Sequence, residues 1–155
     1  MEIWSDVVCP WCAIGKRRFA KALAGFEHRD EVEVSFHSFE LDPEAQEVPA
    51  GGAAAQLAAK YGVSHEQAQA MHRRTAEAAA ADGWNFDFER ARRGNTFDAH
   101  RLLHLAAVQG VQDALKERLF RGYFEEGEAI ADHPTLVRLA TEAGVDADDA
   151  RAVLA

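Results

Sequence analysis

Near the amino terminus the chain reads Glu2-Ile3-Trp4-Ser5-Asp6-Val7-Val8-Cys9-Pro10-Trp11-Cys12. The part from Glu2 to Val8 is rich in aromatic and β-branched side chains, which predicts a short strand. From Trp11 to about Phe26 apolar residues recur at helical spacing, and Pro10 falls in the first turn, where proline is best tolerated. The two cysteines are therefore expected to bracket the start of a helix that directly follows a strand.

A second strand is predicted from Val32 to Phe39, where apolar and polar side chains alternate. Strand, helix and strand in this order form the βαβ unit, whose strands are normally parallel. The residues from Leu41 to Gly52, with two prolines and a Gly-Gly pair, predict a connector. We therefore expect an α/β fold that begins with a βαβ unit.

The rest of the chain is expected to be helical. Ser64 and Gln67 have the spacing of a capping box, which predicts a helix that runs to about Ala80. Start and stop signals predict further helices over residues 95–110, 112–125, 134–143 and 146–155. No further convincing strand is expected.

Composition excludes several classes of function. With 155 residues, 48% of them hydrophobic, the chain can bury a substantial core. Its 17 basic against 26 acidic residues give a net charge of -9, which opposes binding to nucleic acid. No apolar run has the length of a membrane span, and the first residues do not resemble a secretory signal, so a cytoplasmic location without a membrane partner is expected.

The two cysteines are expected to serve chemistry, because a loop this short adds little stability when it is closed by a disulfide. The backbone N–H groups and dipole of the helix start favour the thiolate of Cys9, which predicts the nucleophile. Cys12, one turn further in and expected to be more buried, suits the resolving thiol. Pro10 and Trp11 between them are expected to tune the redox potential, and Trp11 either contacts a substrate or only packs.

A Cys-x-x-Cys pair is also half of a zinc site, which His100 and His104 could complete. The direct junction of strand and helix favours redox chemistry, so no metal site is predicted. The two histidines are expected on a partly buried helix face, while His65 and His72 are expected to be solvated. Asp6 is expected to play a strand-end role, with a proton acceptor near the resolving thiol as the alternative.

The run Ser5-Asp6-Val7-Val8-Cys9-Pro10-Trp11-Cys12-Ala13-Ile14-Gly15-Lys16-Arg17-Arg18-Phe19 resembles the opening of the DsbA-like oxidoreductases of the FrnE group. Phe36 to Pro43 and Asn95 to Leu103 resemble the same group, so the likeness covers nearly the whole chain. It implies a thioredoxin-like fold with an all-helical insertion, which gives residues 1–50 to the N-terminal part of the thioredoxin-like domain and residues 51–155 to the insertion. By this resemblance the nucleophile is Cys9 and the resolving thiol is Cys12.

The resemblance also implies a later strand with a cis-proline that faces the nucleophile. None of the four prolines has a suitable place: Pro10 lies in the motif, Pro43 and Pro49 precede the insertion, and Pro134 opens a helix. We therefore expect a chain that is truncated before that strand, with part of the thioredoxin fold missing.

The preferred hypothesis is a thiol-disulfide oxidoreductase or disulfide isomerase that acts through a mixed disulfide at Cys9. Its expected partners are disulfide-containing proteins or small thiols, with no cofactor other than glutathione considered as a reductant, and a homodimer is left open. The runner-up hypothesis is a glutathione-dependent isomerase or transferase. It rests on a resemblance to the kappa-class glutathione transferases and hydroxychromene-carboxylate isomerases, which have serine at the first cysteine position. A zinc-stabilised structural module is the third hypothesis.

Overall fold

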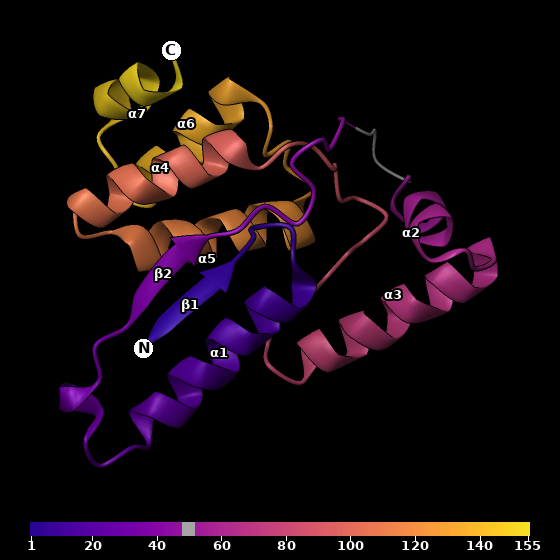
Figure 1. The fold of residues 1–155 in the computed structure, drawn as a ribbon, viewed down its shortest axis with the longest axis horizontal. Coiled ribbons are helices and arrows are strands. Elements are labelled where there is room, and N and C mark those ends of the chain that lie inside the picture. The colour runs from indigo at the N-terminus through magenta and orange to yellow at the C-terminus, as the bar shows by residue number, and fades with distance from the viewer. Residues whose placement is uncertain (48–51) are drawn as a thin grey trace.

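The fold is seen in a computed structural model, which describes residues 1–47 and 52–155. In chain order the elements are β1 (Glu2–Ser5), α1 (Pro10–Ala24), the short 3-10 helix η1 (Arg29–Glu31), β2 (Ser35–Ser38), α2 (Ala53–Tyr61), α3 (His65–Ala80), α4 (Phe97–Val108), α5 (Gln112–Arg121), the π-helical turn η2 (Gly122–Glu126), α6 (His133–Glu142) and α7 (Ala147–Leu154) (Figure 1). The order confirms the predicted strand, helix and strand followed by helices.

The sheet contains β1 and β2, which pair in parallel from Glu2 opposite Ser35 to Ser5 opposite Ser38. Both strands are shorter than predicted. β1 ends at Ser5 because the carboxylate of Asp6 accepts the N–H of Val7 at 2.7 Å, and the carbonyl of Asp6 accepts the N–H of Cys9 at 3.3 Å. These bonds turn the chain away from the sheet and towards α1.

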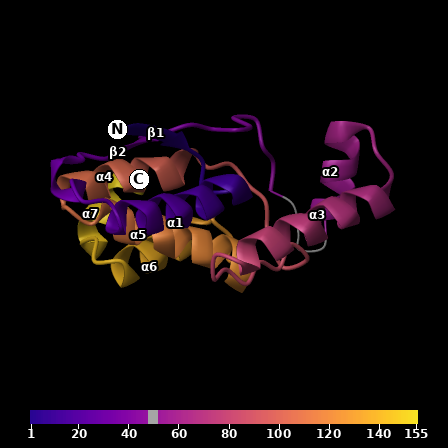
Figure 2. The same cartoon turned by 90° about the horizontal axis from the view of Figure 1, so that it is seen from below.

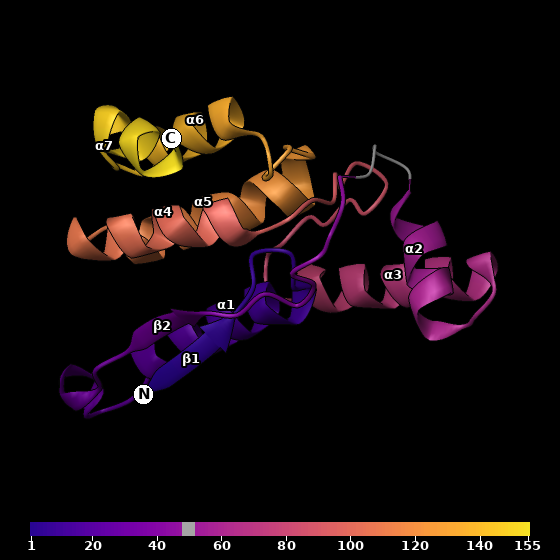
Figure 3. The same cartoon turned by 45° about the horizontal axis from the view of Figure 1, so that its top comes forward.

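The helical body consists of α4, α5, α6 and α7, which pack against one another beside the sheet and α1 (Figures 1 and 3). The buried core is continuous across these elements. Ile14 of α1, Leu102 of α4, Leu115 of α5 and Leu136 of α6 are at most 1% exposed and belong to one cluster. The βαβ unit and the helical body therefore share a single hydrophobic core.

α2 and α3 form a helical hairpin that extends from one side of the molecule (Figures 1 and 2). The predicted capping box at the start of α3 is confirmed, with the side chains of Ser64 and Gln67 each bonded to the other's backbone N–H. α2 was not predicted as a separate helix. The predicted domain boundary after residue 50, and Pro49 with it, lies outside the described residues.

No helix in the described part of the chain is long and apolar enough to cross a membrane.

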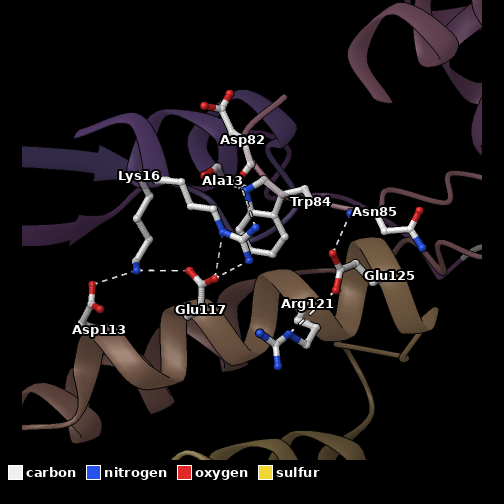
Figure 4. Close-up of polar contacts among 10 residues, drawn as sticks. Ala13, Lys16, Asp82, Trp84, Asn85, Asp113, Glu117, Arg121 and Glu125 are labelled. Carbon is white, nitrogen blue, oxygen red and sulfur yellow. Dashed lines mark hydrogen bonds and ion pairs between the residues drawn. The ribbon is translucent and has the colours of Figure 1, made fainter. Parts of the chain in front are cut away.

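Polar contacts fix α1 against α5 (Figure 4). Lys16 forms ion pairs with Asp113 at 3.0 Å and with Glu117 at 3.2 Å. Arg17 donates to the other oxygen of Glu117 at 2.8 Å, and its guanidinium lies 3.4 Å from the ring centroid of Trp84. α1, the helix that follows Cys9, is therefore held in a fixed position on the helical body.

Candidate active site

Cys9 and Cys12 lie where the sequence places them, at the junction of the first strand and α1. Cys9 is the N-cap residue of α1, with extended backbone angles, and Pro10 occupies the first turn. The backbone N–H of Cys12 donates to the sulfur of Cys9 at 3.3 Å. Both cysteines are free thiols and half-buried. Cys12 is not the clearly more buried of the two, so the expected difference in burial is not found.

The two thiols are electrostatically coupled. Their mutual hydrogen bond is the largest cause that lowers the pKa of Cys12 to about 7, and it also raises the pKa of Cys9. A negative charge shared in this way belongs to the pair, because the bridging proton can sit on either sulfur. The backbone N–H groups of Cys12 and Trp11 favour the anion on Cys9, and these fixed donors do not move with the proton.

Each cysteine lines its own cavity. Cys9 lies at a cavity of about 380 Å³, whose apolar walls include Leu57 of α2 and Met71 of α3. Cys12 lies at a second cavity of about 260 Å³. Trp11 lines both cavities and is 57% exposed. The site thus offers accessible space at the predicted nucleophile, and Trp11 is placed to contact a ligand in either cavity.

Asp6 is almost completely buried, with 1% exposure. Its carboxylate accepts the N–H of Val7 at 2.7 Å and the N–H of Leu41 at 2.8 Å, and it lies 3.2 Å from Nε2 of His100. Burial alone raises the pKa of Asp6, but the bonds from His100 and Leu41 outweigh it and lower this pKa below its ordinary value. An ionised carboxylate with satisfied oxygens fits the expected strand-end role.

His100 and His104, the two histidines that could complete a zinc site, lie in different surroundings. His100 is 4% exposed and contacts Asp6, whereas His104 is exposed and lies 3.0 Å from the hydroxyl of Ser38. The described residues contain no group of three or more side chains that could hold a metal ion.

His72, which was expected to be solvated, is half-buried and stacks on Phe88 with 4.2 Å between ring centroids. Burial lowers its pKa below the ordinary value. The expectation was wrong because α3 packs this side against the segment before α4, a contact that helical spacing does not reveal.

Sequence reasoning missed Lys116, a residue of α5. It is 2% exposed and is one of the largest fully buried side chains of the described residues. Burial lowers its pKa to about 8, while the negative charges of Cys12 and Asp6 act in the opposite direction. A lysine within an amphipathic helix is normally read as part of the solvated face, so no signal in the sequence marked it.

The fold and the dithiol define a thioredoxin-type protein with a helical insertion. All 155 residues match the family described as DSBA-like thioredoxin domain, and the chain belongs to that family. It is 48% identical to a probable DsbA oxidoreductase, SCO1869, of Streptomyces coelicolor, whose crystal structure superposes with a TM-score of 0.92 over 99% of this chain and 66% of that one. It is also 28% identical to the uncharacterized protein YwbO of Bacillus subtilis (strain 168), over 94% of this chain and 66% of YwbO.

The chain thus spans slightly less than two thirds of each of these relatives. Family and neighbour together place it among proteins with a DsbA-like thioredoxin domain.

Proposed function

We propose that this protein is a thiol-disulfide oxidoreductase, and that Cys9 and Cys12 exchange a disulfide with the substrate through a mixed disulfide. The observation that carries the proposal is the position of Cys9. Its sulfur caps α1, accepts the N–H of Cys12 at 3.3 Å and lines the larger cavity. Fixed donors at a helix start stabilise a thiolate, and the thiolate is the attacking form.

In the reductive direction the Cys9 thiolate attacks one sulfur of a substrate disulfide. The substrate S–S bond breaks, one substrate sulfur leaves as a thiolate, and a mixed disulfide joins the other to Cys9. Cys12 then loses its proton and attacks the sulfur of Cys9. The second substrate sulfur leaves and takes up a proton, so the substrate gains two electrons and Cys9 and Cys12 become a disulfide. Two molecules of a thiol such as glutathione would return the pair to the reduced form and leave joined as a disulfide.

The proposal includes a cytoplasmic setting, protein-disulfide or small-disulfide substrates, and a place in the FrnE group. A reducing glutathione pool favours reduction or reshuffling of disulfides over their lasting formation. The cavity at Cys9 supports both substrate classes, since its apolar walls suit a peptide side chain and its volume suits a small disulfide.

The experiment that tests the function compares Cys9→Ser with Cys12→Ser. Both variants are incubated with an oxidised peptide, and covalent adducts are located by mass spectrometry. Cys12→Ser should accumulate a mixed disulfide at Cys9. Cys9→Ser should form at least roughly tenfold less adduct, because its remaining sulfur, that of Cys12, does not stand at the N-cap of α1 and is the poorer nucleophile.

In the wild type, alkylation by iodoacetamide across a pH series should modify Cys9 first, with an apparent pKa below about 8.5. The reason is that the two thiols share one negative charge and the fixed N–H donors at the start of α1 favour it on Cys9. Equal reaction of both cysteines near that value would contradict the proposal. Glutathione-dependent turnover that survives loss of Cys12 would favour the transferase or isomerase alternative instead.

A further inference from the structure

Lys116 lies at an unusual place for a lysine. Its side chain is 2% exposed, and its ammonium nitrogen lies 5.0 Å from the ring centroid of Phe36 and 5.8 Å from that of Phe120. Within the described residues no carboxylate comes within ion-pair distance of it. A buried charge of this kind destabilises a protein unless other charges compensate for it, and the two rings compensate only in part.

The neighbouring lysine shows the contrast. Lys16 lies one turn after Cys12 on α1, and two carboxylates, Asp113 and Glu117, neutralise it within 3.2 Å. The positive charge of Lys16 therefore has little net effect on the two cysteines, because its carboxylate partners cancel most of its electrostatic potential. Among the described residues, no bonded carboxylate cancels the potential of Lys116 in this way.

Phe36, whose ring centroid lies 5.0 Å from the Lys116 nitrogen, lines the same cavity as Cys12, so the lysine and the thiol share a neighbour. The charged groups that act on Lys116 come from three elements. Cys12 and Lys16 lie on α1, Asp6 lies between β1 and α1, and Asp113 lies on α5 itself. Asp6 is already bonded to two backbone N–H groups and to His100. The thiolate of Cys12 is the negative charge at this place that appears and disappears during the reaction.

We propose that Lys116 is a positioning residue for the resolving step, in which its ammonium group stabilises the thiolate that Cys12 must form before it attacks the mixed disulfide at Cys9. The inference rests on the proposed dithiol function. It also gives the helical insertion a part in the chemistry, since α5 carries this charge against Phe36 of β2 and is itself bound to α1 through Asp113 and Glu117.

The test isolates Cys12 by the substitution Cys9→Ser, which leaves a single thiol in the chain. Its ionisation is followed by thiolate absorbance from about pH 5 to about pH 10. Adding Lys116→Met should reduce the fraction of Cys12 thiolate at neutral pH roughly tenfold. The matched control Lys16→Met should change it no more than about twofold, because that charge is already paired.

A conservative variant separates charge from packing. Lys116→Arg keeps the charge and should return the titration towards that of the parent, whereas a purely structural lysine would be replaced better by methionine, the closer match in shape. Lys116→Gln serves as the neutral variant if Lys116→Met does not fold. Equal titrations for the parent and the neutral variant, or equal shifts for Lys116→Met and Lys16→Met, would overturn the inference. The titration requires no turnover, so its failure is distinguishable from failure of the proposed function.

Discussion

At the residue scale the site combines three buried or half-buried ionisable groups of different origin. Cys12 belongs to α1, Asp6 to the turn before it, and Lys116 to α5, which is about a hundred residues away in the chain. Burial disfavours charge on each group. The cation of Lys116 and the two anions partly offset this cost for each other, whereas the carboxylate of Asp6 opposes the thiolate of Cys12. Substitution of one should therefore change the ionisation of its neighbours as well as the stability of the fold.

Lys116 should give stability a distinctive dependence on pH. Burial lowers its pKa from 10.5 to about 8, so between these values the unfolded chain holds more protons than the folded chain. The free energy of unfolding should then rise over this interval, by on the order of 3 kcal/mol from this group alone.

Lys116→Met should lack the rise and should be the more stable protein below pH 8, where the folded wild type carries a buried charge. Urea unfolding of both reduced proteins at stepped pH measures the difference. Tyr123, whose pKa burial raises from 10.0 to about 12, affects the pH dependence of both proteins alike, so the difference between them reports on Lys116. Parallel stability curves for the two proteins would contradict this prediction.

At the element scale the position of α1 depends on its contacts with α5. Glu117 accepts from both Lys16 and Arg17, and Arg17 also covers the indole of Trp84. The indole N–H of Trp84 in turn donates to the carbonyl of Ala13 at 3.3 Å. The helix that presents the two cysteines is thus fixed by side chains from the opposite half of the sequence.

Glu117→Gln should destabilise the protein by about 1 kcal/mol, since it removes the charge shared by two cations while a quarter of its side chain stays accessible to solvent. The loss should shrink as salt concentration rises. Thermal unfolding at low and high salt measures it. Asp148→Asn is the matched control, because the pair of Asp148 with Arg151 is far more exposed and its loss should cost little. A loss for Glu117→Gln no larger than that of the control would show that this contact does not anchor α1.

At the scale of the whole molecule the described elements differ in how firmly they are held. α4, α5, α6 and α7 contribute most of the buried core, whereas Ala54 is the one buried residue of α2. α2 packs mainly against α3, and the pair projects from the body (Figure 2). The wall of the cavity at Cys9 that α2 supplies is therefore its least anchored part.

Hydrogen exchange should resolve this difference. The amides of α2 should exchange through local opening, while those of α5 should exchange only through global unfolding, because buried apolar contacts set the opening free energy. Exchange followed by mass spectrometry on peptides from both helices compares them within one sample. Equal protection of α2 and α5 would mean that the hairpin unfolds together with the core.

Local sequence signals were sufficient for the elements that neighbouring residues define. The strand-to-helix junction at Cys9, the capping box at Ser64 and the helices from Phe97 onward depend on side chains within one or two turns of each other, so their pattern is visible in the chain. The predicted length of β1 was wrong because the carboxylate of Asp6 accepts the N–H of Val7, which a longer strand would use for pairing.

Only the tertiary structure brings Asp6 to His100 and the charge of Lys116 close enough to act on Cys12, and it places His104 beside Ser38 instead. Helical periodicity indicates which face of α4 or α5 is buried, but it does not indicate which element covers that face. The sequence was enough to identify a dithiol at the start of a helix in an α/β fold, since that arrangement is local. The charges that surround the dithiol come from segments far apart in the chain, and only their packing against one core determined which of them act on it.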